Sequence, residues 1–128
     1  MCARKTPLPG KSRMKSQIVL VGVGGQGILL ATRLLAEAAF QRGLPVIGSE
    51  THGMSQRGGS VTSHVRIGGY ASPMVAPASA DIMIALEAGE AYRHLQFLRP
   101  GRSGRPGGTL FVNAEASFPV SPVRELLS

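Results

Sequence analysis

Short apolar runs punctuate the chain, separated by longer amphipathic stretches. Residues 18–21 are all aliphatic, and residues 80–86 and 109–113 are mostly apolar. A run without polar positions is typical of a strand that a parallel sheet buries on both faces. Residues 44–48 add another short strand. Together these runs predict a sheet that carries helices on both faces.

Residues 60–67 follow a different pattern, in which apolar and polar side chains alternate. Three apolar side chains would share one face (Val61, Val65, Ile67), and four polar ones the other (Ser60, Thr62, His64, Arg66). This period of two predicts a strand. We expect its polar face to meet solvent or a partner, as an interface rather than a catalytic surface, and we interpret residues 48–59 as a loop.

Residues 27–41 predict a long helix rich in Leu and Ala, which Gly43 should end. Arg33 and Glu37 lie four residues apart and form one narrow polar face. Because a sheet can cover only one side of a helix, a second apolar face remains. We expect a partner to cover that face.

Residues 90–98 predict a second helix with Ala91, Leu95 and Leu98 turned inward, and another helix should begin at Ser121. The order of elements predicts an α/β fold, a Rossmann-like, doubly wound and mostly parallel sheet. We divide the chain into a basic flexible tail at residues 1–15 and a single domain at residues 16–128, which we expect to be incomplete at its C-terminus.

The net charge of +7 comes from 14 basic and 7 acidic residues, and it is unevenly distributed. Five basic residues precede the first strand (Arg4, Lys5, Lys11, Arg13, Lys15), and three crowd one loop (Arg99, Arg102, Arg105). Because no recognition helix carries this charge, we expect a solvated extension and no nucleic-acid partner. Binding of nucleic acid by the tail is the alternative. No leader or spanning segment is evident, so we expect a soluble, cytoplasmic protein without a membrane partner.

Candidate catalytic and metal-binding residues are few. The single Cys2 provides neither an internal disulfide nor a four-cysteine site for iron–sulfur or zinc. His52 and His64 lie twelve residues apart without a carboxylate or thiol at ligand spacing. Ser55 lacks the following glycine of a nucleophile elbow, because Arg57 stands there. We therefore predict no catalytic residue and no metal site in this chain.

A glycine-rich turn lies between the first strand and the long helix. Gly22, Gly24 and Gly27, with Gly25 and Gln26 between them, satisfy the pattern G-x-G-x-x-G. Such a turn can place backbone N–H groups and a helix N-terminus against a phosphate, or it can simply allow close packing. A dinucleotide would also need an acidic residue about 20 positions further on. The nearest acid, Glu50, falls within the expected loop.

The loop before residue 60 is rich in hydrogen-bond donors. Gln56, Arg57, Gly58 and Gly59 could converge on an anion, with Arg57 pairing a phosphate or a carboxylate. In a doubly wound sheet this loop would lie beside the glycine turn, where ligands collect. It would then contribute to a coenzyme A, substrate or cofactor pocket at a subunit junction. Alternatively, Arg57 pairs with Glu50 and orders the loop against a partner.

Four segments taken together resemble a known family. "VGVGGQGILLATRLLAEAA", "ETHGMSQRGGSVTSHVRIG", "ADIMIALE" and "PGGTLFVN" resemble the gamma subunit, or gamma domain, of the 2-oxoacid:ferredoxin oxidoreductases, and especially the beta subunit of the indolepyruvate-type enzymes. The likeness covers about residues 17–113. The glycine turn paired with E-x-x-G-x-x-Q-R-G-G at this separation is specific.

The resemblance implies a Rossmann-type α/β fold and a role in the coenzyme A-dependent oxidative decarboxylation of a 2-oxo acid. In that family electrons pass from a thiamine diphosphate adduct through iron–sulfur clusters to ferredoxin. This chain has neither a G-D-G pattern nor the cysteines. Thiamine diphosphate, Mg, [4Fe-4S] clusters and coenzyme A are therefore expected on partner subunits, and the isolated chain is expected to be inactive.

Two departures from the family pattern accompany this resemblance. The chain is shorter at its C-terminus, and "RPGRSGRPGGTL" resembles an expanded form of a shorter "RPGGTL" link. The alternative function is a free-standing nucleotide-binding module for NAD or ATP. It predicts a stable monomer or dimer that takes up nucleotide, whereas the oxidoreductase subunit should need a partner.

Overall fold

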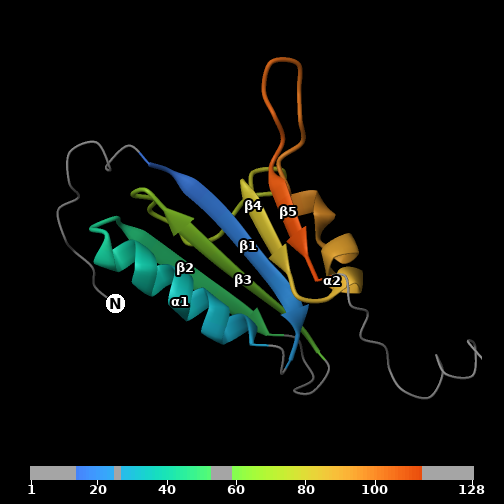
Figure 1. The fold of residues 1–128 in the computed structure, drawn as a ribbon, viewed down its shortest axis with the longest axis horizontal. Coiled ribbons are helices and arrows are strands. Elements are labelled where there is room, and N and C mark those ends of the chain that lie inside the picture. The colour runs from blue at the N-terminus through green and yellow to red at the C-terminus, as the bar shows by residue number, and fades with distance from the viewer. Residues whose placement is uncertain (1–13, 25–26, 53–58, 114–128) are drawn as a thin grey trace, which may run out of the picture.

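The computed structural model describes residues 14–24, 27–52 and 59–113. In this part of the chain, the strands form a single mixed sheet (Figure 1). The strands are β1 (Ser16–Val23), β2 (Val46–His52), β3 (Ser60–Ile67), β4 (Ile82–Ala85) and β5 (Thr109–Val112). The helices are α1 (Ile28–Gln41), α2 (Ala88–Arg93) and the 3-10 turn η1 (Leu95–Phe97).

The strand order is β2-β3-β1-β4-β5. β4 runs parallel to β1 and to β5, whereas β3 runs antiparallel to both β1 and β2. β1, β2, β4 and β5 therefore all point the same way, and β3 alone points the other way. The α/β fold is as predicted, with β3 inserted between the first two parallel strands.

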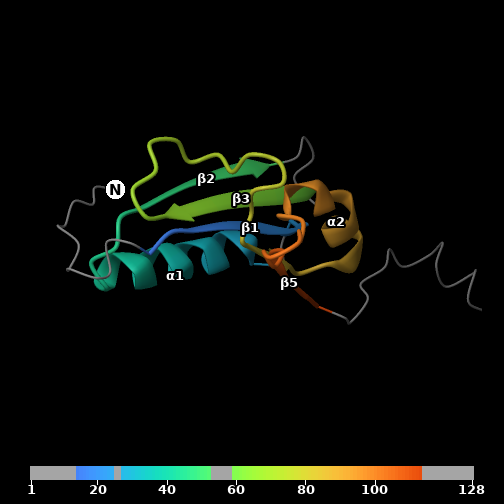
Figure 2. The same cartoon turned by 90° about the horizontal axis from the view of Figure 1, so that it is seen from above.

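The two faces of the sheet carry separate cores. Ile18 and Leu20 of β1 pack with Ile28 and Ala39 of α1, whereas Val19 and Val21 pack with Met83 and the far layer. Figure 2 shows α1 below the sheet and the connection at residues 68–79 above it. Because successive strand side chains point to opposite faces, the aliphatic run of β1 supplies both cores.

The end of α1 follows from its sequence. Gly43 adopts a φ of 76° and donates to Phe40 O at 3.0 Å, and Leu44 N donates to Ala39 O at 3.0 Å. These two bonds form a Schellman motif, which needs a residue without a Cβ penalty in the left-handed region. The predicted helix end at Gly43 is confirmed.

Several local predictions are wrong. Residues 48–52 belong to β2 rather than to a loop, because β3 pairs with that strand as far as His52. The second helix is shorter than expected and continues as a 3-10 turn, which leaves Leu95 42% exposed. β5 was expected to be buried, but it lies at the sheet edge with Phe111 57% exposed.

Candidate functional site at the carboxyl edge

The described ends of the two predicted loops lie at one edge of the sheet. β1 and β2 both end there, and β3 begins there (Figure 1). Gly24 N donates a hydrogen bond to Gly59 O at 2.8 Å, and Val23 is paired with Ser60. This neighbourhood is the one predicted for the two loops. Gly25, Gln26, Gln56, Arg57 and Gly58 lie outside the described residues.

The described glycines of the turn differ in what they do. Gly22 is buried within β1 and paired with Val61, so it belongs to the sheet. The N–H of Gly24 is engaged by Gly59. Gly27 caps α1 with a φ of 90°, and a Cβ there would meet nothing within 4 Å. Glycine is therefore required at position 27 for backbone conformation rather than for space.

Among the residues that the structure describes, no polar side chain caps the N-terminus of α1. Gly27 makes no side-chain cap, and the first turn contains no acidic residue. The first N–H groups of a helix have no partner within the helix, and the helix dipole favours negative charge beside them. The arrangement suits an anion or a carboxylate supplied by a neighbouring chain.

The buried carboxylate of Glu90, on α2, contacts the start of β3 at this edge. Glu90 is 5% exposed and accepts a hydrogen bond from Ser60 Oγ at 2.5 Å. Arg93 Nη1 lies 3.9 Å from the other carboxylate oxygen, and His94 Nδ1 lies 3.7 Å from the first. Glu87 caps α2 by accepting from Glu90 N at 3.0 Å. Because Ser60 directly follows Gly59, this network positions the strand that holds the glycine turn.

The sequence gives little indication that Glu90 is buried. A glutamate at the start of a short amphipathic helix is normally solvated. The alternation of Ser60 and Thr62 does predict a polar face on β3. Glu90 and His94 contact that face, and Thr62 Oγ1 lies 3.4 Å from His94 Nε2. The sequence signal for this network is the combination of a polar strand face with a nearby helix that contains glutamate and histidine.

His64, expected on a wet or partner-facing surface, is buried. It is 2% exposed, its Nδ1 accepts a hydrogen bond from Val75 N at 2.9 Å, and its ring packs edge-on against Phe97 at 5.4 Å. Burial, together with the nearby His94 and Arg66, lowers the pKa of His64 below 6.5. The segment at residues 68–79 covers this face of β3, so the imidazole acts as a neutral structural acceptor.

The position of Glu50 argues against a dinucleotide bound in the usual manner. Glu50 lies on β2, and β3 separates β2 from β1. Two strand spacings place β2 roughly 10 Å from β1, whereas the usual ribose acid lies on the strand next to the glycine turn. A hollow of about 470 Å³ lies beside Glu50, between α1 and β2, and is lined by Thr32, Arg33, Ala36, Val46, Ile47, Gly48, Ser49 and Glu50.

Among the described residues, no group of three or more His, Cys, Asp and Glu side chains is placed to hold a metal ion. Within the same residues, no helix has the length and apolar character needed to cross a membrane.

Comparisons with known proteins agree with this architecture. Residues 17–127 match the family described as Pyruvate ferredoxin/flavodoxin oxidoreductase. The indolepyruvate oxidoreductase subunit IorB of Archaeoglobus fulgidus is 54% identical over 85 residues, which cover 66% of this chain and 42% of that protein. The same subunit from Thermococcus kodakarensis is 44% identical over 108 residues, covering 84% of this chain and 49% of that one.

A solved structure shares the fold. The gamma subunit of a keto/oxoacid ferredoxin oxidoreductase from Geobacter sulfurreducens superposes with a TM-score of 0.57 at 28% identity, over 84% of this chain and 56% of that one. The chain spans about half the length of the curated relatives it matches. Because the family model matches residues 17–127, which are most of the sequence, the chain belongs to the Pyruvate ferredoxin/flavodoxin oxidoreductase family.

Proposed function

We propose that this chain is a non-cofactor-bearing subunit of a 2-oxoacid:ferredoxin oxidoreductase of the indolepyruvate type. The complex would catalyse the coenzyme A-dependent oxidative decarboxylation of a 2-oxo acid and pass electrons to ferredoxin. Family membership supports this proposal, as does the likeness to subunits named for indolepyruvate oxidation. The observation that carries the site is the contact of the glycine turn with Gly59 at one edge.

The redox cofactors do not fit this chain's own side chains. A [4Fe-4S] cluster needs four thiolates, and the sequence contains a single cysteine. We therefore place thiamine diphosphate with its Mg, and the [4Fe-4S] clusters, on partner subunits. The single cysteine also suits a reducing compartment such as the cytoplasm.

The role left to this chain is to shape a junction with the cofactor-carrying subunit. Nine residues form the proposed junction or phosphate site for coenzyme A (Gly22, Gly24, Gly25, Gln26, Gly27, Gln56, Arg57, Gly58 and Gly59). The N-terminus of α1 supports this role, because no side chain of the described residues caps it and the first N–H groups of a helix favour a carboxylate or a phosphate.

An apolar surface offers a second contact for the partner. Leu30 and Leu34 on α1 are 62% and 61% exposed. Phe111 is aligned through Ile84 with Leu20, so it lies on the same side of the sheet as α1. The expected apolar face of α1 is therefore exposed in the described structure. Adjacent exposed leucines on one helix face, such as Leu30 and Leu34, are typical of protein interfaces.

Co-expression tests the proposal directly. The tagged chain is produced with and without the thiamine diphosphate-carrying and iron–sulfur-carrying subunits of an indolepyruvate oxidoreductase. Reduction of ferredoxin is then measured with indolepyruvate and coenzyme A. We expect a stable complex whose activity requires this chain. A clean monomer that ignores those subunits and binds NAD or ATP would favour the nucleotide-binding module instead.

A further inference from the structure

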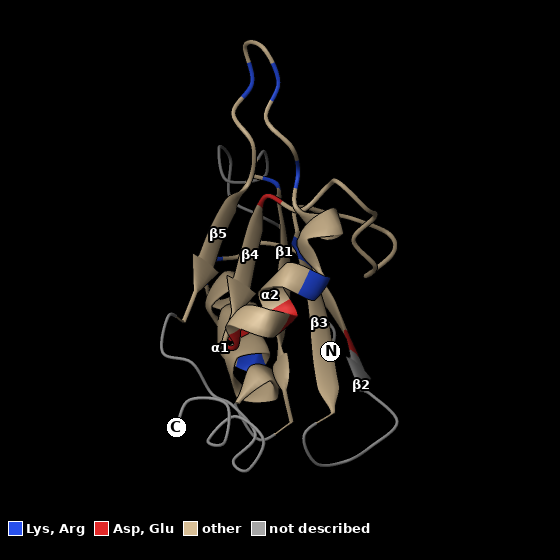
Figure 3. Ribbon diagram, turned by 90° about the vertical axis from the view of Figure 1, so that its right-hand side faces the viewer, with Lys and Arg blue, Asp and Glu red and all other residues tan. Residues whose placement is uncertain are grey.

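A hairpin at the other end of the strands, opposite the carboxyl edge, carries three arginines. Residues 99–108 connect η1 to β5 and stand clear of the domain, with basic residues on both arms (Figure 3). Arg99, Arg102 and Arg105 line a hollow of about 260 Å³ together with Ala78 and Pro100. We propose that this hollow binds the phosphate group of a small molecule.

The hairpin is built so that two of these arginines face the same way. Arg102 N donates to Arg105 O at 2.8 Å, and Arg105 N donates to Arg102 O at 2.9 Å. Residues paired in this manner project their side chains from one side of an antiparallel ribbon. Like charges directly opposite each other repel. An anion between them removes the repulsion and can accept from both guanidinium groups.

The third arginine forms the base of the hollow. Arg99 Nη1 is paired with Asp81, whose other oxygen accepts from Gln17 N at 2.8 Å, and Arg99 Nη2 lies 3.5 Å from Pro106 O. Asp81 therefore fixes this guanidinium. Arg99 Nε is buried, and among the described residues it has no hydrogen-bond partner. With one acid against three bases, the hollow keeps an excess of positive charge.

Ala78, one of the two other lining residues, has an unusual backbone. Ala78 has a φ of 61°, and it is held by its N–H, which donates to Gln96 O at 2.8 Å. A side-chain-bearing residue seldom adopts this region, and such strain tends to occur at binding sites. The hollow can hold a phosphate group and several waters, which suits a small ligand better than a polymer.

Binding of inorganic pyrophosphate tests the proposal. The full chain is titrated by calorimetry at constant ionic strength, with chloride balancing the added anion. The double variant Arg102→Gln, Arg105→Gln is compared with Arg33→Gln, Arg42→Gln, which removes the same charge from exposed positions on and beside α1. Because each charge-assisted contact is worth roughly tenfold in affinity, we expect binding about a hundredfold weaker in the hairpin variant. The control should stay within about twofold.

Three outcomes would overturn the inference. The wild-type chain could fail to bind pyrophosphate, or both double variants could weaken binding equally, as general charge attraction requires. Alternatively, only an oligonucleotide could bind, with binding lost when residues 1–13 are removed, which would assign the anion affinity to the tail. Because Arg102 and Arg105 lie on an exposed hairpin, thermal unfolding should confirm that the variants remain folded.

Discussion

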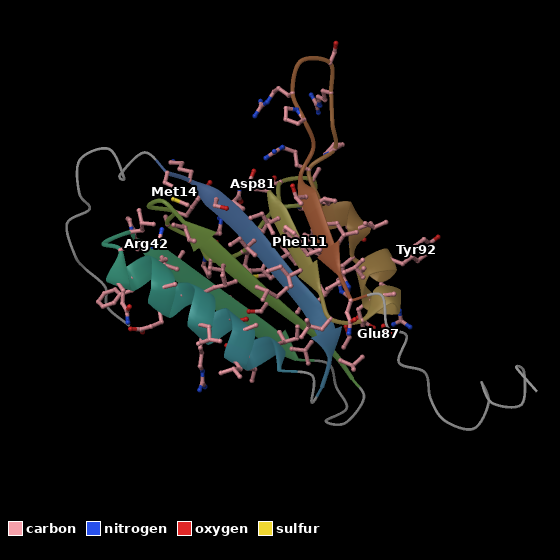
Figure 4. All side chains as sticks on the ribbon, in the orientation of Figure 1. Met14, Arg42, Asp81, Glu87, Tyr92 and Phe111 are labelled. Atoms are coloured by element: carbon pink, nitrogen blue, oxygen red, sulfur yellow. The ribbon has the colours of Figure 1, made fainter. Side chains whose placement is uncertain are left out.

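Replacing Glu90 perturbs the network behind the candidate site most directly. Glu90 is buried, and it belongs to α2. Figure 4 shows α2 beside the carboxyl ends of the strands, near the labelled Glu87. Glu90→Ala removes the acceptor of Ser60 Oγ, whereas Glu90→Gln keeps the side-chain volume and one acceptor oxygen. We expect the alanine variant to be clearly less stable than the glutamine variant.

The magnitude follows from the contacts. A hydrogen bond to a charged group contributes about 1.5–3 kcal/mol. The pair with Arg93 contributes less than about 1 kcal/mol, because that arginine is 70% exposed and 3.9 Å away. Lost burial of methylenes adds to the cost, and relief of the carboxylate's desolvation subtracts from it. Glu90→Ala should therefore lower the free energy of unfolding by about 2–3 kcal/mol, and Glu90→Gln by about 1 kcal/mol.

Urea denaturation followed by circular dichroism measures both variants, together with Ser60→Ala and the double variant Ser60→Ala, Glu90→Gln. The double-mutant cycle should give a coupling of about 1 kcal/mol, since the two side chains are in direct contact. Amide exchange at Gly24 should accelerate as well, because Ser60 is adjacent to its acceptor Gly59. Additive single effects, or a Glu90→Ala variant as stable as the wild type, would refute the role assigned to this carboxylate.

Further predictions concern His64, three glycines and Arg57. The pKa of His64 is lowered on folding. Its contribution to the free energy of unfolding is therefore present above about pH 6.5 and is lost as pH falls toward the folded pKa. His64→Asn should reduce this loss of stability between pH 7.5 and 5.5, as measured by urea midpoints. Gly108→Ala places a Cβ 2.6 Å from a backbone oxygen and should lower the free energy of unfolding by at least about 2 kcal/mol. Gly104→Ala, with a φ of 81° and open space around the Cβ, should lower it by about 1 kcal/mol. Equal melting temperatures of the two variants would contradict the close packing at Gly108. Gly27→Ala should cost about 1–2 kcal/mol through its φ of 90°, measured by thermal unfolding. Arg57→Ala should weaken assembly or activity of the reconstituted complex while the isolated chain keeps its circular dichroism spectrum; wild-type turnover with intact assembly would remove Arg57 from the site.

The elements that the sequence predicts well are those with a strong period and a clear end. The aliphatic run at residues 18–21 became the buried centre of β1, and Gly43 ends α1 as expected. The position of β3 could not be read in the same way, because alternation predicts a strand but not its neighbours or its direction. Burial of His64 escaped prediction for a related reason: residues 68–79 have no regular pattern, yet they cover that face.

Prediction of the candidate site had a similar limit. Gly24 and Gly59 were expected together because loops at one edge of a parallel sheet converge, and their hydrogen bond agrees with this. Glu90 was not expected, since its burial depends on how α2 packs against β3. Local patterns therefore located the backbone of the site, whereas its supporting side chains depended on tertiary packing.

Hydrogen–deuterium exchange of the chain, alone and in the reconstituted complex, tests most directly whether the carboxyl edge is the junction. We expect protection on assembly to be concentrated at residues 22–27 and 53–60, while the amides of residues 99–108 exchange as before. Protection confined to the hairpin edge, with residues 22–27 and 53–60 unchanged, would contradict it.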